Sequence, residues 1–284
     1  MDQGTIDWNG VWKAQWHEHQ RSSKGTTDGG MWDTVEAARS FYRMALENNG
    51  ERVRKTVNNL PLTPESRVLD VGAGPGAIAI PIARQVRHLT AVEPSAAMCS
   101  VFEENLAAEE GIGSVRIVQK RWEDVSVEGD LEPPYDIVFA SYSLDLPDIG
   151  DAIRKMDAVS SGYVFVYWFA GTTSWDAMSM ALWPRLHGSV FVPSPKCDLI
   201  YNLLYSMGIY PNIEVFPFRH INRFPDLDGA VQHFSPRYFA ETAEQKEILR
   251  EYLARYARPD GDTVIVPGTS TRVRIWWKKG DNGA

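Results

Sequence analysis

The chain has few features typical of a disulfide framework, a metal site or a membrane segment. Of its 284 residues only two are cysteines, Cys99 and Cys197. They are far apart and show no metal-ligand spacing, so the sequence predicts no metal site and fits reduced thiols in the cytoplasm. No apolar run reaches the roughly 18 residues of a membrane span. The first residues lack the basic and apolar regions of a signal peptide.

Positive charge is also scarce. Lys and Arg number 29 against 37 Asp and Glu, which gives a formal net charge of −8, and no dense Lys/Arg run is present. Such a surface repels a phosphate backbone, so nucleic acid is not an expected partner. No repeat or low-complexity tract occurs. The 44% of hydrophobic residues is enough for a sizeable core, in one large domain or in a core domain with a cap.

Residues 67–76 are the most informative segment. An apolar strand ends near Asp70, and the chain then turns through Gly72, Gly74 and Gly76 into a helix. Because glycine has no Cβ, a ligand can approach this backbone closely. A helix start also presents free N–H groups and a positive dipole end. The turn therefore predicts a site for a charged, nucleotide-like ligand.

Two kinds of ligand fit this turn. The glycines followed by Ala77 satisfy the dinucleotide pattern G-x-G-x-x-A, and Glu93 after the next strand would hold a ribose in either case. Asp70 favours S-adenosylmethionine (SAM), because a carboxylate repels a pyrophosphate but attracts the sulfonium and amino groups of SAM. Pro75 and Gly76 stand where a dinucleotide fold has already begun its helix. An NAD(P)-dependent oxidoreductase is the less favoured alternative.

From residue 66 the sequence alternates between predicted strands and helices. Strands are predicted at 67–71, 89–92, 115–119, 135–140 and 163–169, and helices at 77–86, 95–110 and 148–159. Ser95 is the expected N-cap of the second helix. This alternation predicts an α/β fold with a doubly wound, mostly parallel, Rossmann-like sheet.

Four motifs over residues 66–170 resemble class I SAM-dependent methyltransferases of the small-molecule type. The glycine turn is the first and residues 89–95 are the second. For the second, the resemblance implies that Glu93, followed by Pro94, accepts hydrogen bonds from the ribose hydroxyls. Residues 119–125 are the third. Here it implies that Trp122 packs on the adenine and that either Glu123 or Asp124 accepts its amine. The implied cofactor-binding set is Asp70, Gly72, Ala73, Gly74, Gly76, Glu93, Pro94, Trp122, Glu123, Asp124 and Ser141.

The fourth motif is residues 135–145. The resemblance implies that Ser141 lies under the methionine part of SAM, and that Tyr142 and Asp145 face the methyl acceptor. The Asn-Pro-Pro-Tyr signature of amide and adenine methylation does not follow this strand, and neither does the Pro-Cys of cytosine C5 methylation. The resemblance also implies a seven-stranded sheet with a C-terminal antiparallel strand, which predicted strands 213–224 and 273–278 would supply.

Methyl transfer from SAM is an in-line displacement that leaves S-adenosylhomocysteine. A general base assists it when the acceptor is acidic, and the candidates are Tyr142, Asp145 and His220. His220 follows Phe216 and Phe218 at a spacing of two, so the three share one strand face. His187 and His233 are weaker candidates, since a lone histidine is usually structural or exposed.

The segments outside the alternating core predict a cap. Trp8, Trp12 and Trp16 fall on one face of a helix, which packs on the main domain in the favoured interpretation and forms a lid over the substrate in the alternative one. A capping box of Asp33 and Glu36 predicts a helix that ends at residues 48–50, with another over 51–60.

Apolar helices are predicted at 175–186 and 198–207, and a long helix is predicted from Ser235 to residue 258. We therefore expect a cap from residues 1–60 and 171–210 over the carboxyl edge of the sheet. The core is residues 61–170, and residues 211–284 complete the sheet. Trp32, Trp168, Trp175 and Trp183 in or near the expected cap favour an apolar or aromatic small-molecule acceptor. A SAM-binding module without catalysis is the alternative from another class.

Overall fold

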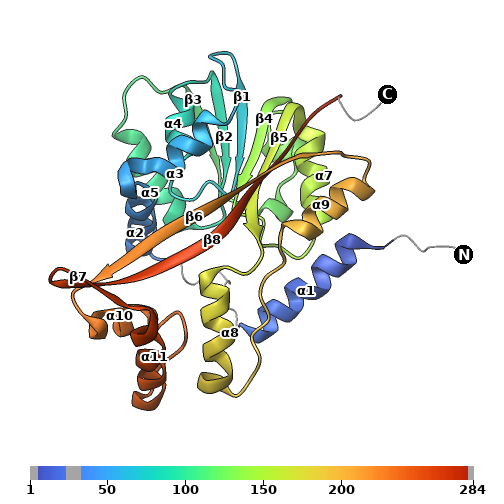
Figure 1. Ribbon diagram of the computed structural model, residues 1–284. Helices are drawn as coiled ribbons and strands as arrows, with labels where there is room; N and C mark the ends of the chain where they lie inside the picture. Colours follow the sequence, from blue (N-terminus) through green and yellow to red (C-terminus); the bar gives the residue numbers. More distant parts are fainter. Residues whose placement is uncertain (1–5, 24–32, 281–284) are drawn as a thin grey trace, which may run out of the picture.

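A single sheet forms the centre of the molecule. The computed structural model describes residues 6–23 and 33–280, in which the strand order is β3-β2-β1-β4-β5-β8-β6, with β7 paired to β8 (Figure 1). The strands are β1 (Arg67–Val71), β2 (His88–Val92), β3 (Ser114–Val118), β4 (Tyr135–Ser141), β5 (Ser160–Ala170), β6 (Asn212–Phe224), β7 (Arg258–Asp260) and β8 (Thr263–Lys278). Strands β1 to β5 are parallel, and β8 is antiparallel to β5 and β6. The predicted fold class is confirmed, with β7 as an additional short strand.

The helices cover both faces of this sheet and also lie along its lower edge in Figure 1. They are α1 (Trp8–Ser22), α2 (Val35–Ala45), α3 (Glu47–Asn58), α4 (Ala79–Ala83), α5 (Ala96–Ala107), α6 (Val127–Asp130), α7 (Ile149–Val159), α8 (Ser174–His187), α9 (Cys197–Ser206), α10 (Leu227–Phe234) and α11 (Ala243–Tyr256), with a 3-10 turn η2 (Trp122–Asp124). Ser95 caps α5 as predicted. Helix α4 is shorter than predicted, and Pro81 within it has no N–H to donate.

The sheet has a hydrophobic core on each face. In β1, Val68 joins one core, together with Val53 and Val57 of α3, while Leu69 and Val71 join the other. The second core also contains Trp12 of α1 and parts of α7 and α9. Continuous apolar strands are expected where helices cover a parallel sheet on both sides, because no strand face meets water.

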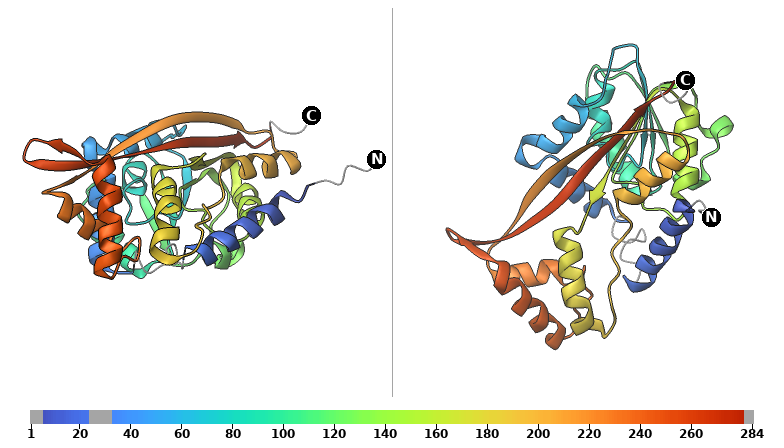
Figure 2. Two further views of the ribbon diagram at one scale, coloured as in Figure 1. Left: turned by 60° about the horizontal axis from the view of Figure 1, so that its bottom comes forward. Right: turned by 45° about the vertical axis from the view of Figure 1, so that its right-hand side comes forward.

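The hairpin of β6 and β8 extends beyond the carboxyl end of β5. The pairing of β5 with β8 stops at Ala170 and Thr271, whereas β6 and β8 stay paired as far as Phe224 and Val264. Helices α8, α10 and α11 gather beside the far end of this hairpin and share a third core (Figure 2). The ribbon thus places this helical group next to the edge at which the parallel strands end.

Other predicted helix boundaries are also wrong. Ser235 ends α10, because its hydroxyl donates back to the Val231 carbonyl, and α11 starts after Thr242, which forms a capping box with Gln245. Helix α2 is capped by Thr34, one residue after the expected Asp33. The break between α2 and α3 falls at Leu46, so residues 48–50 lie inside α3.

The segments expected to form a cap contact the sheet in different ways. In α9, Ile200 and Leu204 are fully buried in the core against β5, so this helix covers a sheet face. In α1, the indole N–H of Trp12 donates to the Leu146 carbonyl after β4, 2.9 Å away. Trp32 lies outside the described residues. The division into cap and core remains a prediction. Among the helices of residues 6–23 and 33–280, none is long and apolar enough to cross a membrane.

Candidate active site

The glycine turn after β1 is tied to the end of β2. The backbone N–H groups of Gly72 and Ala73 both donate to the Val92 carbonyl, at 2.8 and 3.0 Å. Gly72, Gly74 and Gly76 have φ angles of 78°, 57° and 85°, a region that favours glycine. Local sequence therefore fixes the shape of this turn.

The three glycines meet different surroundings. A Cβ on Gly72 would collide with Ser143, and one on Gly76 would collide with the Phe102 ring. A Cβ on Gly74 would have its nearest neighbour 3.7 Å away. The outer glycines are thus required by packing, whereas the middle one leaves backbone accessible at the turn.

The Glu93 side chain bridges the turn and the start of α5. One carboxylate oxygen accepts from the Gly74 N–H and the other from the Ser95 N–H, each at 2.9 Å. Burial raises the pKa of Glu93, and the two backbone hydrogen bonds oppose that rise. Each oxygen keeps a lone pair for a further donor. This arrangement is compatible with the predicted ribose contact, which remains a prediction.

Asp70 is buried under the turn. Its exposed fraction is 2%, and no donor among the described residues forms a hydrogen bond with its carboxylate. Burial, and then the Glu93 carboxylate, raise the pKa of Asp70 well above its ordinary value. An uncompensated buried carboxyl group is costly unless a cation or donor arrives. The amino and sulfonium groups of SAM fit that requirement.

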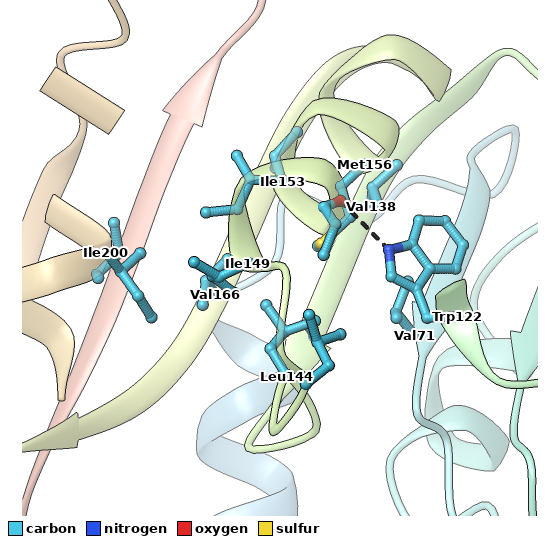
Figure 3. Close-up of a cluster of buried hydrophobic side chains, with 14 of the residues drawn as sticks. Val71, Trp122, Val138, Leu144, Ile149, Ile153, Met156, Val166 and Ile200 are labelled. Carbon is cyan, nitrogen blue, oxygen red and sulfur yellow. Dashed lines mark hydrogen bonds between the residues drawn. The ribbon is translucent and has the colours of Figure 1, made fainter. Parts of the chain in front are cut away.

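The expected adenine contacts divide between core and surface. Trp122 is 5% exposed, and its indole N–H donates to the Ala152 carbonyl at 3.2 Å (Figure 3). Figure 3 shows the ring beside Val71, within the core. Little of the Trp122 ring surface is therefore available to stack on the adenine. Glu123 and Asp124 are both exposed, and the choice between them stays open. Pro94 is exposed beside Glu93.

The end of β4 carries two unusual residues. The Ser141 hydroxyl is buried without a hydrogen-bond partner among the described residues. Tyr142 has a φ of 60°, which is rare for a residue with a side chain. Strained residues of this kind often mark functional sites. The turn points the Tyr142 ring toward Phe169 at the end of β5, with 4.7 Å between centroids.

Aromatic side chains surround Arg272 of β8 at this edge. Its guanidinium carbon lies 3.4 Å from the Phe218 ring centroid and 4.9 Å from that of Tyr142. Phe169 contacts Trp175 of α8 at 5.2 Å, and Trp175 lies 6.2 Å from His220. We call these residues the arginine–aromatic cluster: Tyr142, Phe169, Trp175, Phe218, His220 and Arg272.

The candidate bases differ in protonation and position. Burial raises the pKa of Tyr142, so its phenol keeps its proton at neutral pH. Burial, then Arg272 and Arg237, lower the pKa of His220, so its imidazole is neutral and able to accept a proton. Asp145 accepts a 2.8 Å hydrogen bond from the Trp16 indole.

The two weaker histidine candidates lie apart from this cluster. His187 bonds the Tyr238 carbonyl at 3.0 Å, and His233 packs on Phe224, so both belong to the helical group beside the hairpin.

Sequence reasoning missed Arg272, and also Arg52 of α3, which acts electrostatically on Tyr142. It began the last strand at Val273, ten residues after the observed start at Thr263, and so left Arg272 outside the predicted strand. The alternation of Arg272, Val273, Arg274 and Ile275 was the signal that could have found it.

Two recessed surfaces of the described residues lie away from this cluster. One is lined by Leu62, Pro64 and Gly113, at the amino ends of β1 and β3. Another lies between α10 and α11, around Gln232 and Lys246. Ligands of open α/β sheets bind at the carboxyl ends of the strands, so we assign neither surface to the reaction.

Comparison with known proteins agrees with this geometry. Residues 68–161 match the family model described as a methyltransferase domain. A candidate methyltransferase from Bacillus halodurans C-125 superposes with a TM-score of 0.56 at 16% identity, covering 81% of this chain and 99% of that one. An uncharacterized protein of Haemophilus influenzae is 28% identical over 75% of this chain and 76% of its own length.

A 23S rRNA uracil-C5 methyltransferase of Klebsiella pneumoniae is 32% identical over 108 residues. That alignment covers 38% of this chain and 24% of that longer protein.

Fold, glycine turn and family match together define an S-adenosylmethionine-dependent enzyme of the Rossmann-like class. More narrowly, the domain match over residues 68–161 supports a methyltransferase whose cofactor is SAM.

Proposed function

We propose that this methyltransferase acts on a small-molecule acceptor held at the carboxyl edge of the sheet, over the arginine–aromatic cluster. The observation that carries the proposal is the position of Tyr142. Tyr142 directly follows β4, and its neighbour Ser143 lies against Gly72 of the glycine turn. The Tyr142 ring contacts Phe169 and Arg272. A ring-lined surface next to the cofactor turn suits a planar acceptor.

His220 is the favoured general base. Its imidazole is neutral at neutral pH, because burial and nearby arginines lower its pKa. A neutral imidazole can take the proton of an acidic acceptor as the methyl group is transferred. SAM supplies the activated methyl group, and the protein orients the acceptor and excludes water.

Ribosomal RNA is the second candidate acceptor, because of the partial likeness to the Klebsiella pneumoniae rRNA methyltransferase. The formal net charge of −8 opposes it. Covalent catalysis on a pyrimidine would also need an activated thiolate. Burial raises the pKa of Cys99 to about 12 and also raises that of Cys197. Both charge and thiol chemistry therefore favour the small molecule.

Two measurements test the proposal. First, SAM or S-adenosylhomocysteine should raise the unfolding free energy by about 2.7 kcal/mol at a hundredfold excess over Kd, and NAD(P) should not. Second, methyl-labelled SAM is incubated with a library of aromatic metabolites and, separately, with 23S rRNA. Label in the metabolite fraction supports the proposal. Label in the rRNA alone replaces it with the second candidate.

A further inference from the structure

Arg272 is a partly buried cation without a carboxylate partner. It lies at the carboxyl end of β5, opposite Phe169 in the strand register. Among the described residues it makes no ion pair. Its Nε donates to the Ser270 hydroxyl at 3.3 Å, and its side chain is also hydrogen-bonded to the Tyr142 hydroxyl. Three aromatic rings contact its guanidinium, from β6, from β5 and from the turn after β4.

Arg274 provides an internal comparison. It lies two residues further along β8, so it is on the same face as Arg272. Arg274 forms an ion pair with Glu214 at 2.6 Å, and it also contacts the Asn59 carbonyl and acts on the Tyr167 hydroxyl. The same strand face thus supplies a carboxylate to one arginine, and aromatic rings and hydroxyl groups to the other. A structural role would be served by the same pairing at both positions.

Arg52 of α3 is a second cation without a carboxylate partner that acts on Tyr142. It is partly buried and makes no ion pair within residues 6–23 and 33–280. Arg52 and Arg272 both act electrostatically on the Tyr142 phenol, and burial lowers the pKa of each guanidinium. Two like charges, from α3 and β8, therefore act on one tyrosine, and Arg272 also lies 4.9 Å from its ring centroid.

Such an arrangement costs free energy unless an anion joins it. Removing a charge from water without a partner is unfavourable, and two nearby cations repel each other. The chain has an excess of acidic residues, so the missing partner does not reflect a shortage of carboxylates. A guanidinium stacked on rings keeps its edge N–H donors for a bidentate contact with a carboxylate or phosphate.

We propose that Arg272 and Arg52 bind an anionic group of the methyl acceptor, a carboxylate or a phosphate, while the rings of the arginine–aromatic cluster hold its planar part. This inference rests on the proposed function, since it describes the acceptor of that site. It makes the substrate an anionic aromatic compound and assigns specificity to Arg272.

The test uses simple probes on the full chain loaded with S-adenosylhomocysteine. Benzoate, phenyl phosphate and the neutral benzamide are titrated by saturation-transfer NMR. At least one anion should bind ten times more tightly than benzamide, and the preferred anion identifies carboxylate or phosphate. Arg272→Gln and Arg52→Gln should each remove that preference, with the Kd of SAM unchanged.

Arg219→Gln is the matched control, because Arg219 is exposed on the opposite face of β6. It should keep the full preference for the anion. Equal binding of benzamide and both anions to the unaltered protein would overturn the inference, and so would a preference that survives in both arginine variants. These outcomes differ from a failure of the proposed function, which is label transfer from SAM to rRNA alone.

Discussion

Replacing Glu93 by glutamine tests the centre of the cofactor site. The substitution keeps the size and shape of the side chain but removes its charge and one acceptor oxygen. In the structure the two carboxylate oxygens hold the Gly74 and Ser95 N–H groups, and the predicted ribose contact uses the remaining lone pairs. Glu93→Gln should therefore weaken SAM binding and also loosen the turn.

The two effects have separate magnitudes. A hydrogen bond to a charged group contributes about 1.5–3 kcal/mol, so the Kd of SAM should rise roughly 10- to 150-fold. The fold loses one backbone partner, which costs about 1–3 kcal/mol for an unsatisfied buried N–H. Part of the second loss is offset, because a neutral amide is easier to bury than a carboxylate. The pKa of Glu93, which burial raises, reflects this cost of burying the charged form.

Calorimetric titration with SAM and urea unfolding of the free protein separate these effects. Glu103→Gln is the control, since Glu103 is an exposed glutamate on the same helix, α5. It should change neither quantity. A folded Glu93→Gln variant that binds SAM within twofold of the unaltered protein would refute the ribose assignment.

Three further predictions concern the turn and the core. Asp70→Asn should stabilise the free protein at pH 8 and weaken SAM binding. Because the pKa of Asp70 is raised in the folded protein, the stability that its protonated form contributes is lost as pH rises above about 4. The difference in Tm between the variant and the unaltered protein should therefore shrink as the pH falls toward 4. Gly76→Ala should lower the free energy of unfolding by about 2–5 kcal/mol in urea, because the cost of positive φ and the cost of the clash with the Phe102 ring add. Gly74→Ala should lower it by only about 1–2 kcal/mol, and equal losses would contradict the steric reasoning. Trp12→Ala should cost about 3–5 kcal/mol, since Trp12 is fully buried, and a change below 1 kcal/mol would show that α1 does not belong to the core.

The cofactor turn could be predicted because its determinants are local. The glycines at positive φ, the apolar run of β1 and the Ser95 cap act within a few residues of themselves. The same holds for the strand and helix alternation, and β1 matches its predicted bounds of 67–71. Boundaries failed where two local signals competed, as at Ser235 and Thr242, because a hydroxyl can bond forward as a cap or backward to a carbonyl.

Burial and charge pairing were decided only by the tertiary structure. An indole such as that of Trp122 suits a core or a ligand equally well, and only the packing under β1 and β4 put it in the core. Arg272 and Arg274 are chemically identical in the sequence, yet the register with β6 gives Glu214 to one and aromatic rings to the other. The sequence by itself determined the sheet and the glycine turn predicted to bind SAM, through short-range backbone preferences. The convergence of Arg52, Tyr142 and Arg272 required the fold, because long-range packing alone brings α3, β4 and β8 to one edge.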